Sequence, residues 1–408
     1  MGDGVRRTAT FRETFAVGEF RALWFAELQS VFGDQLARVA LSVLVFERTS
    51  SATWPALTYA LTYLPDLFGG PLLGGLADRL PRRQVMVTTD VLRALLVGLM
   101  AVPNLPLPVL AGVLILVRLL NAPFNAAQAA VLPNILDGDR YLLGQSVRQV
   151  TSQAGQLAGF AAGGVVVALI GPNRALAVDA LTFAVSALVI RLGLRDRPAA
   201  GSAAQGETTT LRRLAAGART IWRDPRLRSL VSLAWLAGFV IVPEGLAVPY
   251  ADEIGGGPVT AGLLLAAHPA GIVIGAFVLG RFVPPELRLR LVGILAVGAV
   301  VPLLAYFFRP GVAVTCALLL LSGMCASYQV TASATFMRLV PDAERGQAFG
   351  LAGSGLIAVQ GIGLLVGGGL AAVLESPAVT VGVVAAAGVL AAVPAAASWR
   401  NALRHHPL

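Results

Sequence analysis

Lysine is absent from this chain, cysteine occurs only twice, and charged residues make up only 13% of the 408 residues, whereas 56% are hydrophobic. Soluble domains of this length carry roughly twice that fraction of charge. The composition therefore excludes a soluble globular protein and indicates a membrane protein. The two cysteines, Cys316 and Cys325, lie nine residues apart in one apolar run, which fits neither a disulfide framework nor a metal site.

Signals for nucleic-acid binding and for catalysis are also missing. The net charge is +9, but the arginines fall between apolar runs instead of forming the basic face that nucleic acid requires. Glu-x-x-His patterns, a serine elbow in context and a phosphate loop are absent, so we expect neither an enzyme nor an ATPase, and no metal or cofactor. A polytopic membrane enzyme with a catalytic cluster at the membrane edge is the remote alternative.

What the chain has instead is a series of long apolar runs. A membrane-spanning helix needs about 20 mostly apolar residues, and breaks that contain Pro and Gly separate the runs. We predict twelve spans, near residues 21–46, 54–76, 85–103, 107–132, 146–170, 174–194, 229–250, 259–282, 289–308, 312–337, 346–373 and 378–399.

The distribution of arginine predicts the orientation of these spans. Only Arg48, Arg174 and Arg309 fall in loops assigned to the outside, whereas most of the 31 basic residues fall in loops assigned to the cytoplasm. We therefore expect a multi-pass protein of the inner (cytoplasmic) membrane, embedded in the lipid bilayer, with both termini in the cytoplasm. The first twenty residues contain no short apolar core before a cleavage site, so no signal peptide is expected.

A long polar segment divides the chain. Residues 1–194 are predicted to form an N-terminal six-helix bundle and residues 229–408 a C-terminal one, joined by a cytoplasmic linker at 195–228. Residues 211–222 of the linker place apolar side chains on one helical face and arginines elsewhere. This pattern predicts a basic amphipathic helix on the inner leaflet.

An internal repeat supports this division. Residues 122–129 match residues 326–333 in type. Three glycines recur at the same offset of 204, namely Gly159, Gly163 and Gly164 as Gly363, Gly367 and Gly368. Two pseudo-symmetric bundles would place a substrate site between them near the bilayer midplane.

Three motifs resemble signatures of the major facilitator superfamily, and the resemblance covers essentially the whole chain. Residues 75–83 resemble the family's loop between helices 2 and 3, with Pro81 in place of a glycine. Residues 114–121 resemble its helix 4 signature around Arg118, and residues 155–164 resemble the helix 5 glycine signature of exporters, with Phe160 in place of a proline. Further stretches, at 20–24, 33–38 and 133–144, are similar to the enterobactin-exporter and macrolide-efflux branch. The resemblance implies an all-α fold of twelve transmembrane helices and proton-driven export of small organic molecules.

Charged residues inside the predicted spans mark a candidate proton site. Asp34 and Arg38 lie one turn apart in the first span, Asp66 lies deep in the second, and Arg118 lies near the middle of the fourth. A charge in hydrocarbon costs several kcal/mol unless it is paired or hydrated. A carboxyl group that moves between an apolar environment and a guanidinium can take up and release a proton. We predict Asp34 as the carrier, Asp66 as a partner or second carrier and Arg118 as a tuning group; the alternative is a static salt-bridge network.

The other buried charges are assigned simpler roles. Asp90 and Arg93, three residues apart, are predicted to form a local structural pair. We expect Glu27 to reach the membrane interface by snorkelling. Asp179 and Glu244 are expected either to line an outer vestibule or to be solvated. His268 is predicted to be a hydrogen-bonded packing residue without an evident partner, the alternative being a proton relay.

By analogy with the family, a substrate cavity is expected between helices 1, 4, 7 and 10. An amphipathic ligand needs a mostly apolar lining with a few hydrogen-bonding groups. Alternatively, these Asn and Gln side chains join helices by hydrogen bonds. The candidate lining residues are Gln35, Asn121, Phe124, Asn125, Trp235, Tyr328 and Gln329. Three glycines at four-residue spacing are predicted to pack closely against a neighbouring helix, namely Gly155, Gly159 and Gly163.

The charged turn between the second and third spans is predicted to be a conformational switch. The resemblance implies that Asp78 faces the N-terminal end of the eleventh span near Gly346, where free N–H groups favour an anion. Arg82 or Arg83 would contact Asp137 or Asp139 and hold the inner side closed. The predicted switch residues are Gly75, Asp78, Arg79, Arg82 and Arg83.

These expectations combine into one prediction of function. We expect a monomeric secondary transporter that uses the proton gradient to export a small hydrophobic or amphipathic compound by alternating access. A proton-coupled uptake transporter or a facilitator of the same fold is the alternative within the class, and the glycine signature of the fifth span argues against uptake.

Overall fold

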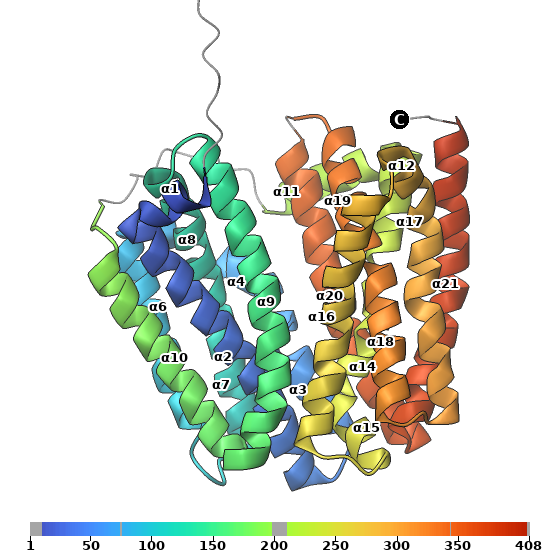
Figure 1. Ribbon diagram of the computed structural model, residues 1–408, viewed down its shortest axis with the longest axis horizontal. Coiled ribbons are helices and arrows are strands. Elements are labelled where there is room, and N and C mark those ends of the chain that lie inside the picture. The colour runs from blue at the N-terminus through green and yellow to red at the C-terminus, as the bar shows by residue number, and fades with distance from the viewer. Residues whose placement is uncertain (1–9, 74–75, 198–209, 343, 406–408) are drawn as a thin grey trace, which may run out of the picture. The chain divides into compact units, whose positions relative to one another are not determined.

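The computed structural model describes residues 10–73, 76–197, 210–342 and 344–405, and the regular elements in these ranges are all helices (Figure 1). The N-terminal ones are α1 (Phe11–Ala16), α2 (Gly18–Thr49), α3 (Thr53–Ala60), α4 (Leu64–Leu73), α5 (Leu76–Arg79), α6 (Arg82–Met100), α7 (Leu107–Leu119), α8 (Asn121–Ile135), α9 (Asp139–Ile170) and α10 (Pro172–Gly193).

The helices after the linker are shorter and more often interrupted. They are α11 (Thr210–Arg223), α12 (Pro225–Ala234), α13 (Ala237–Val240), α14 (Val242–Gly245), α15 (Ala247–Glu253), α16 (Pro258–Phe282), α17 (Pro285–Val300), the 3₁₀ helix η1 (Val301–Phe308), α18 (Val312–Ala326), α19 (Tyr328–Leu339), α20 (Arg345–Leu374) and α21 (Pro377–His405).

Each of the twelve predicted spans coincides with a helix or a run of helices. Within the described ranges, nine helical segments are long and apolar enough to cross a membrane. The three predicted spans outside this set correspond to α2, to α3 with α4, and to α6. Both α2 and α6 carry several charged residues, and α3 is separated from α4 by a short break. Charges exclude α2 and α6 from this set, whereas the break leaves α3 and α4, with 8 and 10 residues, each shorter than a span.

The chain forms two compact contact units. Unit one contains the chain up to Ala37, Phe68–Gly159 and the stretch from Asn173 to the linker. Unit two contains Arg38–Leu67, Phe160–Pro172 and Gln205–Leu408. Helices α2 and α9 therefore each contribute to both units. Because these units differ from the predicted halves, the boundaries at 194 and 228 stay a prediction.

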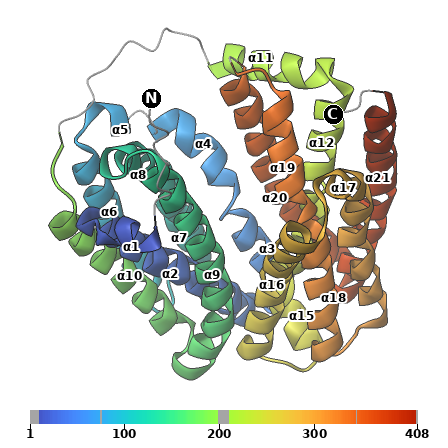
Figure 2. The same cartoon turned by 45° about the horizontal axis from the view of Figure 1, so that its top comes forward.

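Unit one has an apolar core beneath α2, α6, α8, α9 and α10, which gather together in Figure 2. Large side chains that are fully buried in this core include Phe20, Leu23 and Met86. Burying an apolar side chain of this size stabilises the fold by about 1.5–3 kcal/mol. This core fixes the relative positions of the helices that carry the charged residues described below.

Unit two contains a helix pair that packs backbone against backbone. A Cβ atom on Gly271 of α16 would overlap the carbonyl oxygen of Leu320 in α18. A Cβ atom on Gly323 of α18 would overlap the carbonyl oxygen of His268 in α16. Only glycine permits so close an approach, which is common where helices associate without a hydrophobic driving force.

Replacing Gly271 by Ala should therefore destabilise the protein by about 1–3 kcal/mol, the usual cost of overpacking. Gly280→Ala is the matched control, because Gly280 also lies in α16 and a Cβ atom added there would have no neighbour within 4 Å. Unfolding of the two purified variants in detergent would measure the difference. Equal stabilities would contradict the backbone contact.

The helix pairing repeats between the two parts of the sequence. In unit one, a Cβ atom on Gly159 of α9 would lie 2.7 Å from the carbonyl oxygen of Phe32 in α2. In unit two, a Cβ atom on Gly363 of α20 would overlap the carbonyl oxygen of Gly238 in α13. Gly159 and Gly363 are the glycines related by the offset of 204. Corresponding helices therefore meet at corresponding glycines in the two repeats, as a duplication predicts.

A second pair of contacts, both in unit two, follows the same symmetry. Gly164 of α9 faces Gly262 of α16, where a Cβ on Gly262 would lie 2.7 Å from the Gly164 Cα. A Cβ on Gly368 of α20 would lie 3.1 Å from the Ala56 Cβ of α3. Gly164 and Gly368 again differ by 204 positions.

The linker helix α11 packs on the beginning of α20. A Cβ atom on Gly217 would lie 2.5 Å from the carbonyl oxygen of Gln347, and the Thr220 hydroxyl donates a hydrogen bond of 2.6 Å to Glu344. The predicted helix is thus present and fixed to unit two, while its position on the inner leaflet stays a prediction.

Candidate functional site

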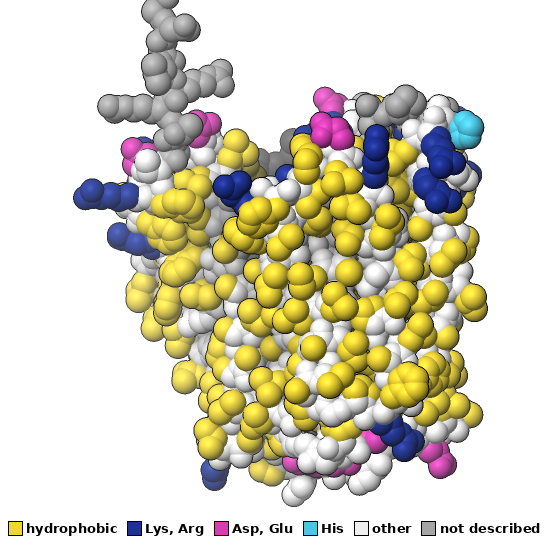
Figure 3. All heavy atoms as spheres, turned by 45° about the vertical axis from the view of Figure 1, so that its right-hand side comes forward, with side chains coloured by type: hydrophobic (Ala, Val, Ile, Leu, Met, Phe, Trp, Pro, Cys, Tyr) yellow, Lys and Arg dark blue, Asp and Glu magenta, His cyan; other side chains and the backbone are white. Residues whose placement is uncertain are grey.

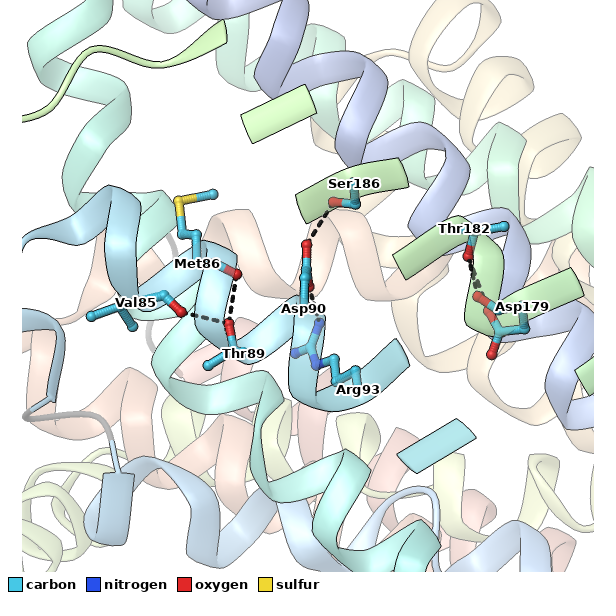
Figure 4. Close-up of polar contacts among 8 residues, drawn as sticks. All are labelled: Val85, Met86, Thr89, Asp90, Arg93, Asp179, Thr182 and Ser186. Atoms are coloured by element: carbon cyan, nitrogen blue, oxygen red, sulfur yellow. Dashed lines mark hydrogen bonds and ion pairs between the residues drawn. The ribbon is translucent and has the colours of Figure 1, made fainter. Parts of the chain in front are cut away.

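A buried ion pair occupies the middle of α6 in unit one. Asp90 is completely buried, and its carboxylate accepts hydrogen bonds from the Ser186 hydroxyl of α10 at 2.6 Å and from the Arg93 guanidinium at 3.3 Å (Figure 4). Residues three apart in a helix share one face. The predicted pairing of Asp90 with Arg93 is confirmed.

Two aromatic rings complete the surroundings of this guanidinium. The Arg93 Cζ atom lies 4.9 Å from the centroid of the Phe124 ring and 5.4 Å from that of Phe183. A cation over an aromatic face is stabilised by about 2 kcal/mol or more when it is desolvated. Arg93 is only 3% exposed, so α8 and α10 both help to hold its charge inside the fold.

Asp179 of α10 lies buried in the same unit, with 1% of its surface exposed. Its carboxylate lies 3.2 Å from the Thr182 hydroxyl (Figure 4). A Cβ atom on Gly33 of α2 would overlap both the Asp179 carboxylate and the Thr182 hydroxyl. The prediction that Asp179 is solvated or lines an outer vestibule is therefore wrong, because the missing side chain at Gly33 lets α10 bring this carboxyl against α2.

Asp34 follows Gly33 and completes a group of three acids. Asp34 is half-buried, and its charge interacts with the carboxyl groups of Asp90 and Asp179. The charge of Arg93 also interacts with both carboxyl groups. We name Asp34, Asp90, Asp179 and Arg93 the carboxyl cluster. In it three carboxyl groups accompany one guanidinium, and ionising all three would place like charges together in a region of low dielectric constant. The cluster therefore contains more carboxyl groups than the single guanidinium can pair with.

A second polar group lies in unit two. The Tyr59 hydroxyl of α3 donates a hydrogen bond of 2.8 Å to the Glu244 carboxylate of α14. The Arg38 guanidinium lies 5.6 Å from the centroid of the Tyr59 ring and 5.2 Å from that of Tyr63. The His268 Nδ1 atom lies 3.8 Å from the other Glu244 oxygen, and its buried Nε2 atom has no hydrogen-bond partner among the described residues.

This arrangement corrects the expectation for Glu244, whose side chain is only 11% exposed. A Cβ atom on the following Gly245 would lie 3.5 Å from the Ala56 Cα atom of α3. The glycine lets α14 approach α3, so that the carboxylate meets Tyr59 instead of solvent. His268 is buried as predicted, and Glu244 is the neighbour that its sequence context does not reveal.

Replacing Tyr59 by Phe should destabilise the protein by about 1–3 kcal/mol, because a largely buried carboxylate loses a hydrogen bond. Tyr141→Phe is the control, since the hydrogen bond that the Tyr141 hydroxyl accepts from Gln145 is exposed. Thermal unfolding of both variants in detergent checks this, and a Tyr59→Phe variant as stable as the control would show that the hydrogen bond contributes nothing.

The four residues predicted to couple protons are distributed between the units. Asp34 and Arg118 belong to unit one, whereas Arg38 and Asp66 belong to unit two. Asp66 is half-buried in the first turn of α4, and Arg118 lies in the last turn of α7. The structure brings Asp34 close to Asp90 and Asp179 and places Arg38 over two tyrosine rings. The proton-coupling role of all four stays a prediction.

Glu27 forms an ion pair inside unit one. Its carboxylate lies 2.5 and 3.1 Å from two nitrogen atoms of the Arg148 guanidinium in α9 and accepts a hydrogen bond of 3.2 Å from Gln128. The expectation that Glu27 snorkels to the interface is wrong, because a partner on α9 satisfies it in place.

The predicted switch is described only in part. Gly75 and the Asp78 side chain lie outside the described part of the structure, and Arg79 is exposed at the end of α5. The Arg82 guanidinium donates to the carbonyl oxygen of Ala130 at 2.7 Å, and Arg83 pairs with Asp196 at 3.1 Å. Pro81 starts α6 at Arg82, so both arginines reach residues of α8 and of the chain after α10 instead of Asp137 or Asp139.

The predicted substrate residues have different surroundings. Phe124 and Tyr328 are 6% and 2% exposed, so neither presents a surface to a ligand in this conformation. Tyr328 donates a hydrogen bond of 2.6 Å to the Leu233 carbonyl, and Trp235 donates one to the Ala352 carbonyl, so both side chains join neighbouring helices. Gln35 is buried, Asn121 and Gln329 are half-buried, and Asn125 is exposed.

The three predicted packing glycines are buried or in contact. A Cβ atom on Gly155 would lie 3.2 Å from Val31, and one on Gly159 would lie 2.7 Å from the Phe32 carbonyl oxygen. Gly163 is buried as well. These distances fit helices that pack closely at Gly155 and Gly159, and the packing role of the three glycines stays a prediction.

Known proteins resemble this chain along most of its length. The macrolide efflux protein A of Streptococcus pyogenes is 22% identical over 362 residues, which cover 85% of this chain and 88% of that protein. The multidrug efflux pump Tap of Mycolicibacterium fortuitum is 26% identical over 372 residues, which cover 87% and 89%. These relatives support the predicted efflux-like branch.

Solved structures share the fold. The nucleoside transporter NupG has a TM-score of 0.69 at 13% identity and covers 94% of this chain and 99% of its own. The peptide transporter POT in complex with sulfate has a TM-score of 0.71 at 16% identity and covers 97% of both chains. The predicted all-α fold is confirmed. Because the family model described as Major Facilitator Superfamily matches residues 23–244 and 245–407, the chain belongs to this superfamily and is a multi-pass membrane transporter.

Proposed function

We propose that this transporter exports a small hydrophobic or amphipathic organic compound from the cytoplasm in exchange for protons. The carboxyl cluster of unit one carries this proposal, because it gathers three carboxyl groups and one guanidinium inside membrane helices. Such a group is costly unless it is paired or takes up protons. The relatives named for macrolide and multidrug efflux support the direction and the class of compound.

In this proposal Asp34 is the entry point of the cluster and Asp90 and Asp179 are its buried members. A proton that binds at Asp34 lowers the net negative charge around Arg93 and favours the compact arrangement of α2, α6 and α10. Release of the proton to the other side of the membrane restores the charge. The proton gradient thereby supplies the energy, and both termini lie in the cytoplasm.

The contacts within unit two correspond, in this proposal, to closure at the outer side. The glycine contact of α9 with α16, the contact of α3 with α20 and the Tyr59–Glu244 hydrogen bond lie toward the ends predicted to face outside. Export then requires these contacts to part so that the compound can leave.

Transport by the purified full-length protein in proteoliposomes tests the proposal. A macrolide and a panel of fluorescent dyes would be assayed under a pH gradient of either sign, with empty liposomes as the control. We expect transport of a compound against the direction of proton flow and its collapse when an uncoupler dissipates the gradient. Movement together with protons would indicate uptake, and transport insensitive to the gradient would rule out proton coupling.

A further inference from the structure

A groove of about 380 Å³ runs along unit two between α17 and α21. It shares no residue with the carboxyl cluster or with the Tyr59–Glu244 group, and none of its residues has a role in the proposed function. The residues that line it are Arg290, Gly293, Ile294, Val297, Val393, Ala396, Ala397, Trp399 and Arg400.

The floor of the groove is fixed by close packing. A Cβ atom on Gly293 would lie 3.1 Å from the Ala396 Cβ, so α17 and α21 nearly touch there. Trp399 is 1% exposed, and its indole N–H donates a hydrogen bond of 2.9 Å to the Leu289 carbonyl. The floor of the groove is therefore set by packed residues of α17 and α21.

The sides of the groove are apolar and open outward. Ile294 is 68% exposed and Val393 is 53% exposed, and Val297 also lines the groove. Figure 3 shows a broad hydrophobic surface over this side of the molecule. In a membrane-spanning helix pair, such a surface is in contact with acyl chains.

Two arginines stand at one end of the groove. Arg290 and Arg400 are exposed, and among the described residues neither has an acidic partner within 4.0 Å. The neighbouring Arg288 differs, because it donates to the Val283 and Gly280 carbonyl oxygens. A groove that is cationic at one end and apolar along its length is complementary to an amphipathic anion.

We propose that this groove is a binding site for an anionic phospholipid. The phosphate contacts Arg290 and Arg400, and one acyl chain lies along Ile294, Val297 and Val393, a path of about 10 Å from Arg290 to Val297 in helix α17. Basic pockets between membrane helices recognise lipid headgroups in this way. A second copy of the chain is the less suitable occupant, because two-fold pairing through this face would bring like charges together.

The test measures binding of phosphatidylglycerol and of phosphatidylcholine to the purified full-length protein by native mass spectrometry. We expect the wild type to prefer phosphatidylglycerol. Arg290→Gln/Arg400→Gln should weaken its binding about 30-fold, which corresponds to roughly 1 kcal/mol for each arginine. Arg191→Gln/Arg281→Gln, which removes two exposed arginines elsewhere, is the charge-matched control and should bind as the wild type does.

A second variant keeps the test decisive if the double variant does not fold. Ala397→Phe places a ring in the groove without altering its charge and should weaken phosphatidylglycerol binding to a similar extent. Equal binding of both lipids, unchanged binding by both groove variants, or complete competition by inorganic phosphate would overturn the proposal. Dimers that depend on Arg290 and Arg400 would also overturn it, because a second copy would then occupy the groove.

Discussion

Replacing Asp34 by Asn is expected to impair proton-driven transport strongly while leaving the protein folded. The amide keeps the size of the side chain but removes the half-exposed group through which the carboxyl cluster would exchange its proton. A loss of 1.4 kcal/mol in the coupling free energy between proton and substrate already corresponds to about a tenfold change in the effect of one ligand on the affinity for the other. We therefore expect proton-driven efflux to fall by about tenfold or more in proteoliposomes.

Transport of the substrate down its own gradient distinguishes a loss of proton coupling from a loss of transport itself. Substrate flow down its own gradient, without a pH gradient, should persist in Asp34→Asn. Asp252→Asn is the matched control, because it makes the same chemical change at an exposed residue of α15. If Asp34→Asn retained full coupling and the pH dependence of the wild type, the carboxyl cluster would be a static network that only orders α2, α6 and α10.

Replacing Arg93 by Leu should destabilise the protein by about 3–5 kcal/mol, the usual effect of removing one partner from a buried ion pair. The change leaves the fully buried Asp90 carboxylate without its guanidinium and removes the cation between Phe124 and Phe183. Chemical unfolding of the purified protein in mixed micelles measures this difference.

A double-mutant cycle identifies the cause. Asp90→Asn/Arg93→Leu should recover part of the lost stability, because it removes the uncompensated charge as well. Arg191→Leu makes the same substitution at an exposed position in α10 and should be close to neutral. A double variant no more stable than Arg93→Leu alone would show that packing against the two rings, and not charge, sets the cost.

The positions of the helices could be predicted from the sequence because hydropathy and the distribution of arginine are local properties of the chain. A run of about 20 apolar residues needs no distant partner to be recognised as a span. Even α2 and α6, whose charges reduce their mean hydropathy, were identified because polar turns and arginines delimit them. The contact units could not be predicted, because they depend on which helix ends meet.

The partners of the buried charges were predictable only where they lie on the same helix. The spacing of Asp90 and Arg93 was sufficient to pair them. The surroundings of Asp179 depend on the missing side chain at Gly33, and those of Glu244 depend on Gly245 and Tyr59. Both acids were visible as charges within spans, but depth along a helix does not say which neighbouring helix a side chain faces.

The contact between Gly164 and Gly262 has a consequence for the speed of conformational change. Two glycines that face each other have no side chains to interlock, so no rotamer has to change at this point when α9 and α16 part. The loss at this point is dispersion between backbone atoms, about 0.1–0.2 kcal/mol for each atom pair. Larger residues at these positions would have to disengage from one another first. The glycines thus keep the activation barrier for separating the two helices low, whichever ligand drives the separation.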